Sequence, residues 1–206
     1  MTRQLHALLR NAALVALAAV TLSGCAALII GGAVGTALMV TDRRTAGVQL
    51  EDQSIELKAA TRIRDAVGER GHISVVSYNR MVLLTGEVAS EADRAAVEQA
   101  IVRIENVRST VNELAVMGSS SMTARSNDTI LTSKVKASFL DAKDLQANTI
   151  KVVTERGTVF LMGRVTEREA VRAAELARGV SGVQKVVRVF DILTDAELAA
   201  LGGTRN

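Results

Sequence analysis

The sequence predicts an α+β protein built from two tandem small domains. Each domain is ordered helix–strand–strand–helix–strand, with a three-stranded mixed sheet that carries both helices on one face. The first observation behind this prediction is an internal repeat, in which the segment Ile73–Val88 recurs 77 residues later as Ile150–Val165. The second is that a stretch with helical spacing of apolar residues stands before and after each copy.

Each repeated segment reads as a hairpin followed by a helix. The turns are Tyr78-Asn79-Arg80 and Glu155-Arg156-Gly157, which contain residue types that hairpin turns favour. The next helix opens with Ser90-Glu91-Ala92-Asp93 in the first copy and with Thr166-Glu167-Arg168-Glu169, a full capping box, in the second. Gly86 and Gly163 fall at equivalent positions where the second strand ends, so we expect them to serve backbone geometry.

A helix also precedes each hairpin, and a third strand ends each domain. Apolar residues four apart form one stripe per helix: Ile55, Ala59 and Ile63 in the first copy, and Leu131, Val135 and Phe139 in the second. The third strands are expected at residues 109–116 and 185–192. Phe139, Phe160 and Phe190 align with Ile63, Leu83 and Leu114, which predicts that the three phenylalanines touch one another in a core.

The chain divides into six segments. A signal peptide is expected at residues 1–24 and a lipid-anchored tether at residues 25–53. The first domain is expected at residues 54–116, a Ser-rich linker at 117–127 and the second domain at 128–193. A tail at residues 194–206 contains a second capping-box pattern and predicts a short helix at about 195–201.

The N-terminus has the features of a targeting segment. Arg3 and Arg10 precede an almost wholly apolar run at residues 11–22. The run ends in Leu22-Ser23-Gly24-Cys25, which resembles the lipobox of bacterial lipoproteins, and the resemblance implies cleavage before Cys25 and acylation of that residue. The alternatives are an ordinary signal peptide and an uncleaved membrane helix, because apolar character continues to Val40.

Composition argues against several classes of function. The chain of 206 residues has a single Cys, two His and four aromatic residues. These numbers leave no internal disulfide, no cluster of metal ligands, no cofactor site and few platforms on which nucleic-acid bases could stack. After cleavage His72 is the only histidine, and it has no equivalent in the second copy. We therefore expect a protein that is not an enzyme.

The pattern of elements resembles the BON domain, a module of the bacterial envelope. Two copies behind a lipobox are similar to the dual-BON outer-membrane lipoproteins of the DolP (YraP) family, over about residues 40–193. The similarity is sharpest at Ser126-Asn127-Asp128-Thr129, Thr132-Ser133-Lys134-Val135, Val159-Phe160-Leu161-Met162-Gly163 and Val165-Thr166-Glu167-Arg168-Glu169-Ala170. The resemblance implies a protein anchored by lipid in the outer membrane and facing the periplasm, which binds anionic phospholipid through its second domain and supports outer-membrane integrity.

Charge and spacing favour the same second domain. Residues 54–116 hold eight Lys/Arg and nine Asp/Glu, whereas residues 128–193 hold eleven and eight, a net charge of +3. In the first helix of this domain, Ile130, Lys134 and Lys136 fall largely outside the apolar stripe and Leu140 falls near its edge. These four residues are the expected phospholipid contact. Relatives often carry an aromatic residue at the position of Ile130. The alternative is that Ile130 packs on the other domain and that the lysines form a solvated face.

Two other functions stay open at the level of sequence. One is a protein-interaction adaptor, for example for the machinery that assembles outer-membrane proteins. The other is a periplasmic stress-response chaperone, by resemblance to soluble dual-BON proteins, although those lack an acylated cysteine. In each case we expect no nucleic-acid partner and a monomeric chain.

Overall fold

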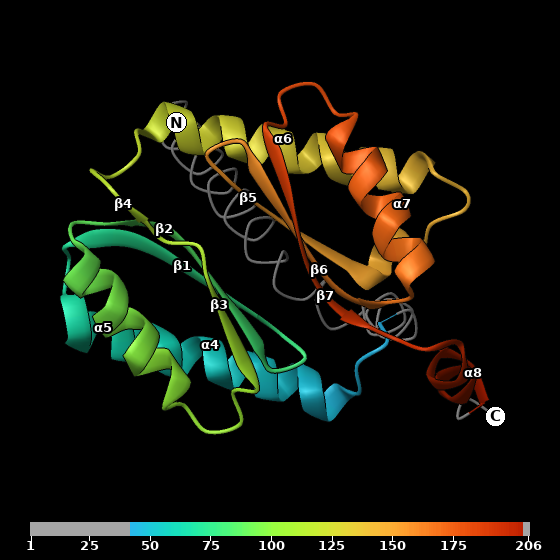
Figure 1. Cartoon of the computed structure of the whole chain (residues 1–206), viewed down its shortest axis with the longest axis horizontal. Helices are drawn as coiled ribbons and strands as arrows, with labels where there is room; N and C mark the ends of the chain where they lie inside the picture. The colour runs from blue at the N-terminus through green and yellow to red at the C-terminus, as the bar shows by residue number, and fades with distance from the viewer. Residues whose placement is uncertain (1–41, 204–206) are drawn as a thin grey trace, which may run out of the picture. The chain divides into compact units, whose positions relative to one another are not determined.

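The computed structural model describes residues 42–203, which belong to one compact unit. Figure 1 shows its two sheets and the helices that cover them. The signal peptide, Cys25 and most of the expected tether lie outside the described residues, so the expectations for them stay predictions. Within the described part, no helix is long and apolar enough to span a bilayer.

The first domain follows the predicted order. Its elements are α4 (Ala46–Val67), β1 (Gly71–Tyr78), β2 (Met81–Val88), α5 (Glu91–Val102), β3 (Ser109–Asn112) and β4 (Ala115–Val116). The strand β2 pairs antiparallel with β1 and parallel with both β3 and β4, so the sheet is mixed as expected. The expected third strand is divided because the Leu114 amide donates to Asn112 Oδ1 instead of continuing the ladder.

The second domain repeats this order and adds a short terminal helix. Its elements are α6 (Met122–Asp141), a 3₁₀ turn η2 (Ala147–Thr149), β5 (Ile150–Glu155), β6 (Thr158–Val165), α7 (Glu167–Arg178), β7 (Lys185–Ile192) and α8 (Asp195–Gly203). The central strand β6 again pairs antiparallel with one neighbour and parallel with the other. The α+β prediction of two tandem αββαβ domains is confirmed, as is the capping box between Thr166 and Glu169.

Both first helices begin earlier than the sequence predicts. The helix α4 starts at Ala46 within the expected tether, where the Thr45 side chain accepts a hydrogen bond from the Val48 amide. The helix α6 starts at Met122 within the expected linker, capped in the same way by Ser121. The first turns of both helices lie outside the apolar stripes from which the helices are predicted. The N-terminal caps Thr45 and Ser121, rather than buried apolar residues, set where each helix begins.

Gly86 and Gly163 serve the backbone, as predicted. A Cβ atom at Gly86 would lie 2.0 Å from the His72 carbonyl oxygen, and one at Gly163 would lie 2.5 Å from that of Thr149. Gly86 also has a φ of +111°, which favours glycine over every other residue. Both glycines therefore permit the neighbouring strand to approach closely.

The helix-facing side of each sheet forms a hydrophobic core. In the first domain the stripe of α4 packs against Val82, Leu84 and Leu114, and in the second the stripe of α6 packs against Val159 and Leu161. Phe139 and Phe190 belong to this second core, but Phe160 does not. The prediction that the three phenylalanines touch one another is therefore wrong for Phe160. Successive strand residues point to opposite faces, and Phe160 lies on the face away from the helices.

That opposite face packs against the other domain. A third hydrophobic cluster joins Tyr78, Met81 and Leu83 of the first sheet to Phe160, Met162 and Val189 of the second. The two sheets thus bury their free faces against each other, while the helices cover the outside (Figure 1). Leu83 and Phe160, which are equivalent positions of the repeat, belong to this same interdomain cluster.

Polar contacts surround this interdomain cluster. Asp191 of β7 accepts hydrogen bonds from Asn79 Nδ2 at 2.7 Å and from an Arg108 guanidinium nitrogen at 2.8 Å, both from the first domain. At the other end, the buried carboxylate of Glu87 lies 3.8 Å from Arg156 Nε of the second domain. Burial, with the charges of Glu87 and Asp128, raises the pKa of neighbouring Glu155.

Candidate functional site

The helix α6 presents a partly apolar face to solvent. Its buried side consists of Asp128, Leu131, Val135 and Phe139. On the other side, Met122 is 74% exposed, Ile130 54% and Leu140 69%. The alternative expectation that Ile130 packs on the other domain is therefore wrong. Three large apolar side chains are thus exposed on α6, spaced eight and ten residues apart along the helix.

The two predicted lysines flank this face on opposite sides. Lys134 lines a hollow of about 570 Å³ together with Ile130, and Lys136 lines another of about 390 Å³ together with Leu140. Neither lysine has an ion pair among the described residues. The structure thus brings the four predicted residues onto one helix but divides them between two hollows.

The hollow beside Lys136, which we call the entry hollow, is where the described chain begins. Its walls combine the start of the chain, the end of β1, the second half of α6 and the start of β5. They consist of Asp42, Arg44, Tyr78, Lys136, Phe139, Leu140, Ala147, Asn148, Ile150 and Lys151. The segment that links the N-terminal region to the domains therefore enters directly beside Lys136 and Leu140.

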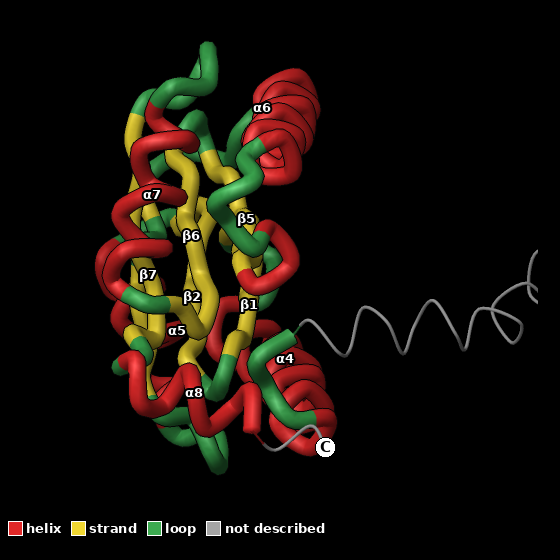
Figure 2. The backbone as a smooth tube through the Cα atoms, turned by 90° about the vertical axis from the view of Figure 1, so that its right-hand side faces the viewer, coloured by secondary structure: helices red, strands yellow, loops and turns green. Residues whose placement is uncertain are grey.

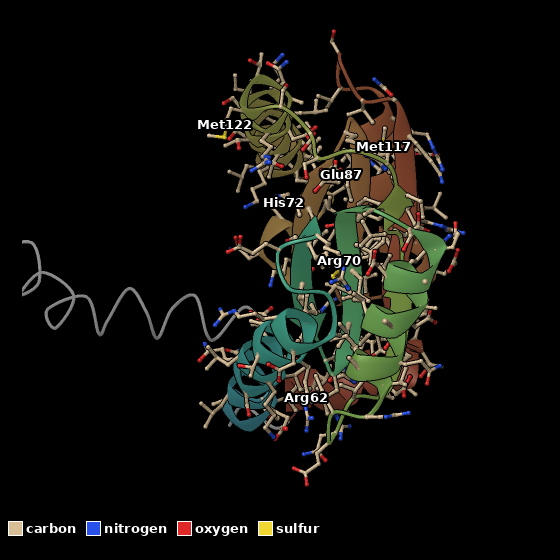
Figure 3. The ribbon with its side chains drawn as sticks, turned by 90° about the vertical axis from the view of Figure 1, so that its left-hand side faces the viewer. Arg62, Arg70, His72, Glu87, Met117 and Met122 are labelled. Atoms are coloured by element: carbon tan, nitrogen blue, oxygen red, sulfur yellow. The ribbon has the colours of Figure 1, made fainter. Side chains whose placement is uncertain are left out.

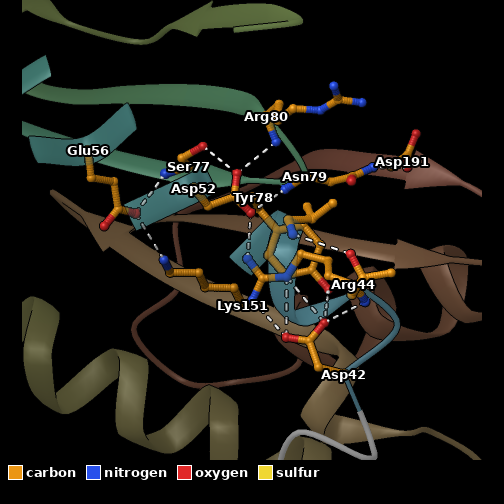
Figure 4. A network of polar contacts seen from close by, with 12 residues as sticks. Asp42, Arg44, Asp52, Glu56, Ser77, Tyr78, Asn79, Arg80, Lys151 and Asp191 are labelled. Atoms are coloured by element: carbon orange, nitrogen blue, oxygen red, sulfur yellow. Dashed lines mark hydrogen bonds and ion pairs between the residues drawn. The ribbon is translucent and has the colours of Figure 1, made fainter. Parts of the chain in front are cut away.

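A network of polar contacts fixes this entry (Figure 4). The Arg44 guanidinium binds Asp42 at 2.7 Å and Asp52 at 2.8 Å, and it lies over the Tyr78 ring at 3.9 Å from the centroid. Burial, with a further contribution from the charge of Asp42, raises the pKa of Tyr78 to about 12. Tyr78 is therefore a neutral hydroxyl at neutral pH, and its oxygen lies 3.4 Å from the Thr149 carbonyl oxygen.

The residue before Arg44 binds the other domain. Arg43 makes a bidentate pair with Glu169, at 2.7 and 2.8 Å, and donates to the Arg164 carbonyl oxygen at 2.9 Å. Burial alone would raise the pKa of Glu169, but the hydrogen bonds and charge of Arg43 and the hydrogen bonds from Thr166 outweigh it and lower that pKa below 4.5. Asp42 to Arg44 thus connect the chain entry to both domains.

Two equivalent aspartates hold the hairpin turns, a role that the helix and strand periodicity does not predict. Asp52 accepts from the Asn79 amide at 2.8 Å, the Arg80 amide at 2.7 Å and the Ser77 hydroxyl at 2.7 Å. Asp128 accepts from the Arg156 and Gly157 amides at 2.7 and 2.9 Å. Each aspartate stands three residues before the first position of its helix stripe, a signal that the repeat alignment could have provided.

Among the described residues, His72 is the only histidine. His72 lies on β1 opposite Glu87 in the strand pairing (Figure 3), and no third group positions it. Between residues 42 and 203 there is no group of three or more His, Cys, Asp or Glu able to hold a metal ion. The sites found in the described part of the chain are an exposed helix face and two hollows that are lined by both apolar and charged side chains.

Comparison with known proteins agrees with this domain organisation. The family model of the BON domain matches twice, at residues 52–118 and 127–194. The chain is 37% identical over 188 residues to the outer membrane lipoprotein DolP of Haemophilus influenzae, covering 90% of this chain and 97% of that protein.

Two further relatives are more distant. The 21 kDa hemolysin of Actinobacillus pleuropneumoniae is 34% identical over 73% of this chain and 78% of its own length. The osmotically-inducible protein Y of Escherichia coli is 29% identical over 66% of this chain and 70% of its own length. The name of the first relative refers to the outer membrane and that of the second to lysis of cells. None of these three protein names refers to a chemical reaction.

Proposed function

The chain belongs to the family of dual BON-domain outer-membrane lipoproteins, and from that premise we propose that it binds anionic phospholipid through α6 and so supports the integrity of the outer membrane. It is anchored in the outer membrane by lipid. The proposal concerns what the protein does there: α6 of the second domain contacts the bilayer, and the protein acts by binding rather than by catalysis.

The observation that carries this proposal is the exposed face of α6. Ile130 and Leu140 would enter the boundary between headgroups and acyl chains, where each buried methylene contributes about 0.8 kcal/mol. Lys134 and Lys136 flank them and would meet anionic headgroups, at about 1 kcal/mol for each cation near the surface. Apolar residues between cations are the arrangement that an interfacial helix requires.

The place where the chain enters supports the same contact. Asp42 lies in the entry hollow beside Lys136 and Leu140. We propose Cys25 as the acylated residue, and the segment from there to Asp42 reaches at most roughly 60 Å when fully extended. A tether of this length keeps α6 at a high effective concentration near the bilayer, so weak contacts suffice.

Vesicle flotation of the unacylated chain from residue 42 tests the proposal, because these residues form one compact unit. The double variant Lys134→Glu/Lys136→Glu should bind vesicles of phosphatidylethanolamine and phosphatidylglycerol at least about thirtyfold more weakly, because the loss of two cations at about 1 kcal/mol each is joined by repulsion from two added carboxylates. Vesicles of phosphatidylcholine alone should bind the unmodified chain poorly.

The matched control is Arg178→Glu/Lys185→Glu, which makes the same change of charge at exposed positions of α7 and β7. This control should retain most of its affinity. Equal losses in the two double variants would indicate a general charge effect, and no loss in either would favour the protein-interaction adaptor.

A further inference from the structure

The helix α4 of the first domain has an exposed apolar face that no described segment covers. Leu50 is 68% exposed and Leu57 74%, whereas Ile55, Ala59 and Ile63 are buried in the core. Leu50 and Leu57 are seven residues apart, which places them on one face of a helix that turns by about 100° per residue. This face, which we call the α4 face, lies opposite the buried stripe.

The charges around the α4 face are mainly positive. Arg62 and Arg64 are exposed on α4 and have no ion pair among the described residues, whereas the exposed Lys58 pairs with Glu105 at 3.6 Å. The exposed acid of this helix is Asp65. Two other acids of α4 are engaged elsewhere: Glu51 accepts from Asn106 at 3.0 Å, and Glu56 accepts from the Ser77 amide at 2.8 Å. The α4 face therefore combines apolar side chains with cations, as the exposed face of α6 does, but one of its three cations is already paired.

The two helices project on the same side of the unit. Figure 2 shows α4 and α6 together on one side, with α5 and α7 on the other. Figure 3 shows the same arrangement from the opposite direction and places Met122 of α6 on that side. The entry hollow, where Asp42 begins the described chain, joins residues of both domains to the second half of α6.

We propose that α4 is a second membrane-contacting helix, so that the protein rests on an anionic bilayer through both domains. This inference rests on the proposed function of α6. The occupant of the α4 face is the bilayer rather than a protein, because the chain is lipid-anchored and its entry lies on this side of the unit. A planar surface can meet two helices that project on one side, and the cations beside the α4 face complement its charge.

Depth-dependent fluorescence in the acylated full-length chain tests this proposal. Single variants Leu57→Cys, Ile130→Cys, Val102→Cys and Val171→Cys are labelled with an environment-sensitive dye and reconstituted in vesicles of phosphatidylethanolamine and phosphatidylglycerol. All four positions are exposed, so the label does not disturb a core. Val102 on α5 and Val171 on α7 are the matched controls, because these helices lie on the opposite side.

The expected result is a blue shift of the labels at positions 57 and 130, with loss of their emission when the lipids carry brominated acyl chains. The control labels should show neither. Quenching at 130 without quenching at 57 would overturn the α4 contact and leave the proposed function intact. Quenching at 57 alone would support the α4 contact and overturn the proposed role of α6. A blue shift at 57 that bromine does not quench would assign this face to a second copy of the chain, which also overturns the proposal.

Discussion

Arg43 and Arg44 are adjacent in the chain but bind different domains. Arg43 reaches Glu169 and the Arg164 carbonyl of the second domain, whereas Arg44 pairs with Asp52 and covers Tyr78 of the first. The sequence does not predict these contacts, because both arginines lie in the expected tether, where charged side chains are expected to be solvated. Only folding brings partners that are more than a hundred residues away in sequence to Arg43.

The pair of Arg43 and Glu169 should make stability depend on pH. The pKa of Glu169 in the folded protein lies below its ordinary 4.5, so its contribution is complete above about pH 4.5 and is lost as the pH falls through the lowered value. The variant Arg43→Met should be about 2 kcal/mol less stable at pH 7, because it removes charge-assisted hydrogen bonds at a pair that is largely buried. Its stability should also fall less steeply between pH 5 and 3.

Urea unfolding at a series of pH values measures both effects. Arg172→Met is the control, because Arg172 pairs with Asp144 at the same 2.8 Å in a more exposed setting. It should cost less than about 1 kcal/mol. Identical pH profiles for Arg43→Met and the unmodified protein would contradict the assignment.

At the scale of elements, each first helix holds the hairpin that follows it. Asp52 on α4 and Asp128 on α6 accept the amides of the β1–β2 and β5–β6 turns. These turns include Asn79, Arg80 and Arg156, which adopt positive φ without being glycine, so the hydrogen bonds stabilise a conformation that is otherwise unfavourable. The repeat in the sequence is thus a repeat of a polar contact as well as of a hydrophobic pattern.

Removal of these carboxylates should destabilise the protein unequally. Asp52→Ala leaves two turn amides and the Ser77 hydroxyl without their acceptor and removes one of the two carboxylates that bind Arg44, so we expect a loss of about 3–4 kcal/mol. Asp128→Ala leaves only two turn amides, and its loss should be about 1–2 kcal/mol.

Chemical denaturation of the two variants provides the comparison, with Asp52→Asn as the conservative control. Asparagine retains one carbonyl oxygen as an acceptor and should recover part of the loss. If Asp52→Ala and Asp128→Ala lost equal stability, Ser77 and Arg44 would add nothing to the stabilising effect of Asp52, which would contradict this prediction.

At the scale of the whole molecule, the two domains pack against each other through their sheets and share a hydrophobic cluster. The strands β2 and β6 are apolar on both faces, as in Met81-Val82-Leu83-Leu84 and Val159-Phe160-Leu161-Met162. An unbroken apolar run is typical of a strand buried on both sides. The prediction that Phe160 packs with Phe139 and Phe190 considered only the face of the sheet that the helices cover. Phe160 lies on the other face, in the interdomain cluster.

Processing at the N-terminus is also a property of the whole molecule. The proposed acylation predicts a mature protein that lacks residues 1–24 and carries lipid on Cys25, which intact-mass measurement reports in one experiment. The variant Cys25→Ala should retain its leader and carry no lipid. A mature mass that includes residues 1–24, or that shows no added acyl mass, would contradict the lipobox interpretation and leave the uncleaved helix as the alternative.

The sequence alone was sufficient for the order of elements, the duplication and the helix that carries Ile130, Lys134, Lys136 and Leu140. Each of these depends on local periodicity or on self-similarity, which a linear chain displays directly. The packing of sheet on sheet, the divergent contacts of Arg43 and Arg44, and the shared side of α4 and α6 depend on residues far apart in sequence. Such contacts follow from which surfaces remain apolar after each domain has formed its own core, and only the tertiary structure decides that.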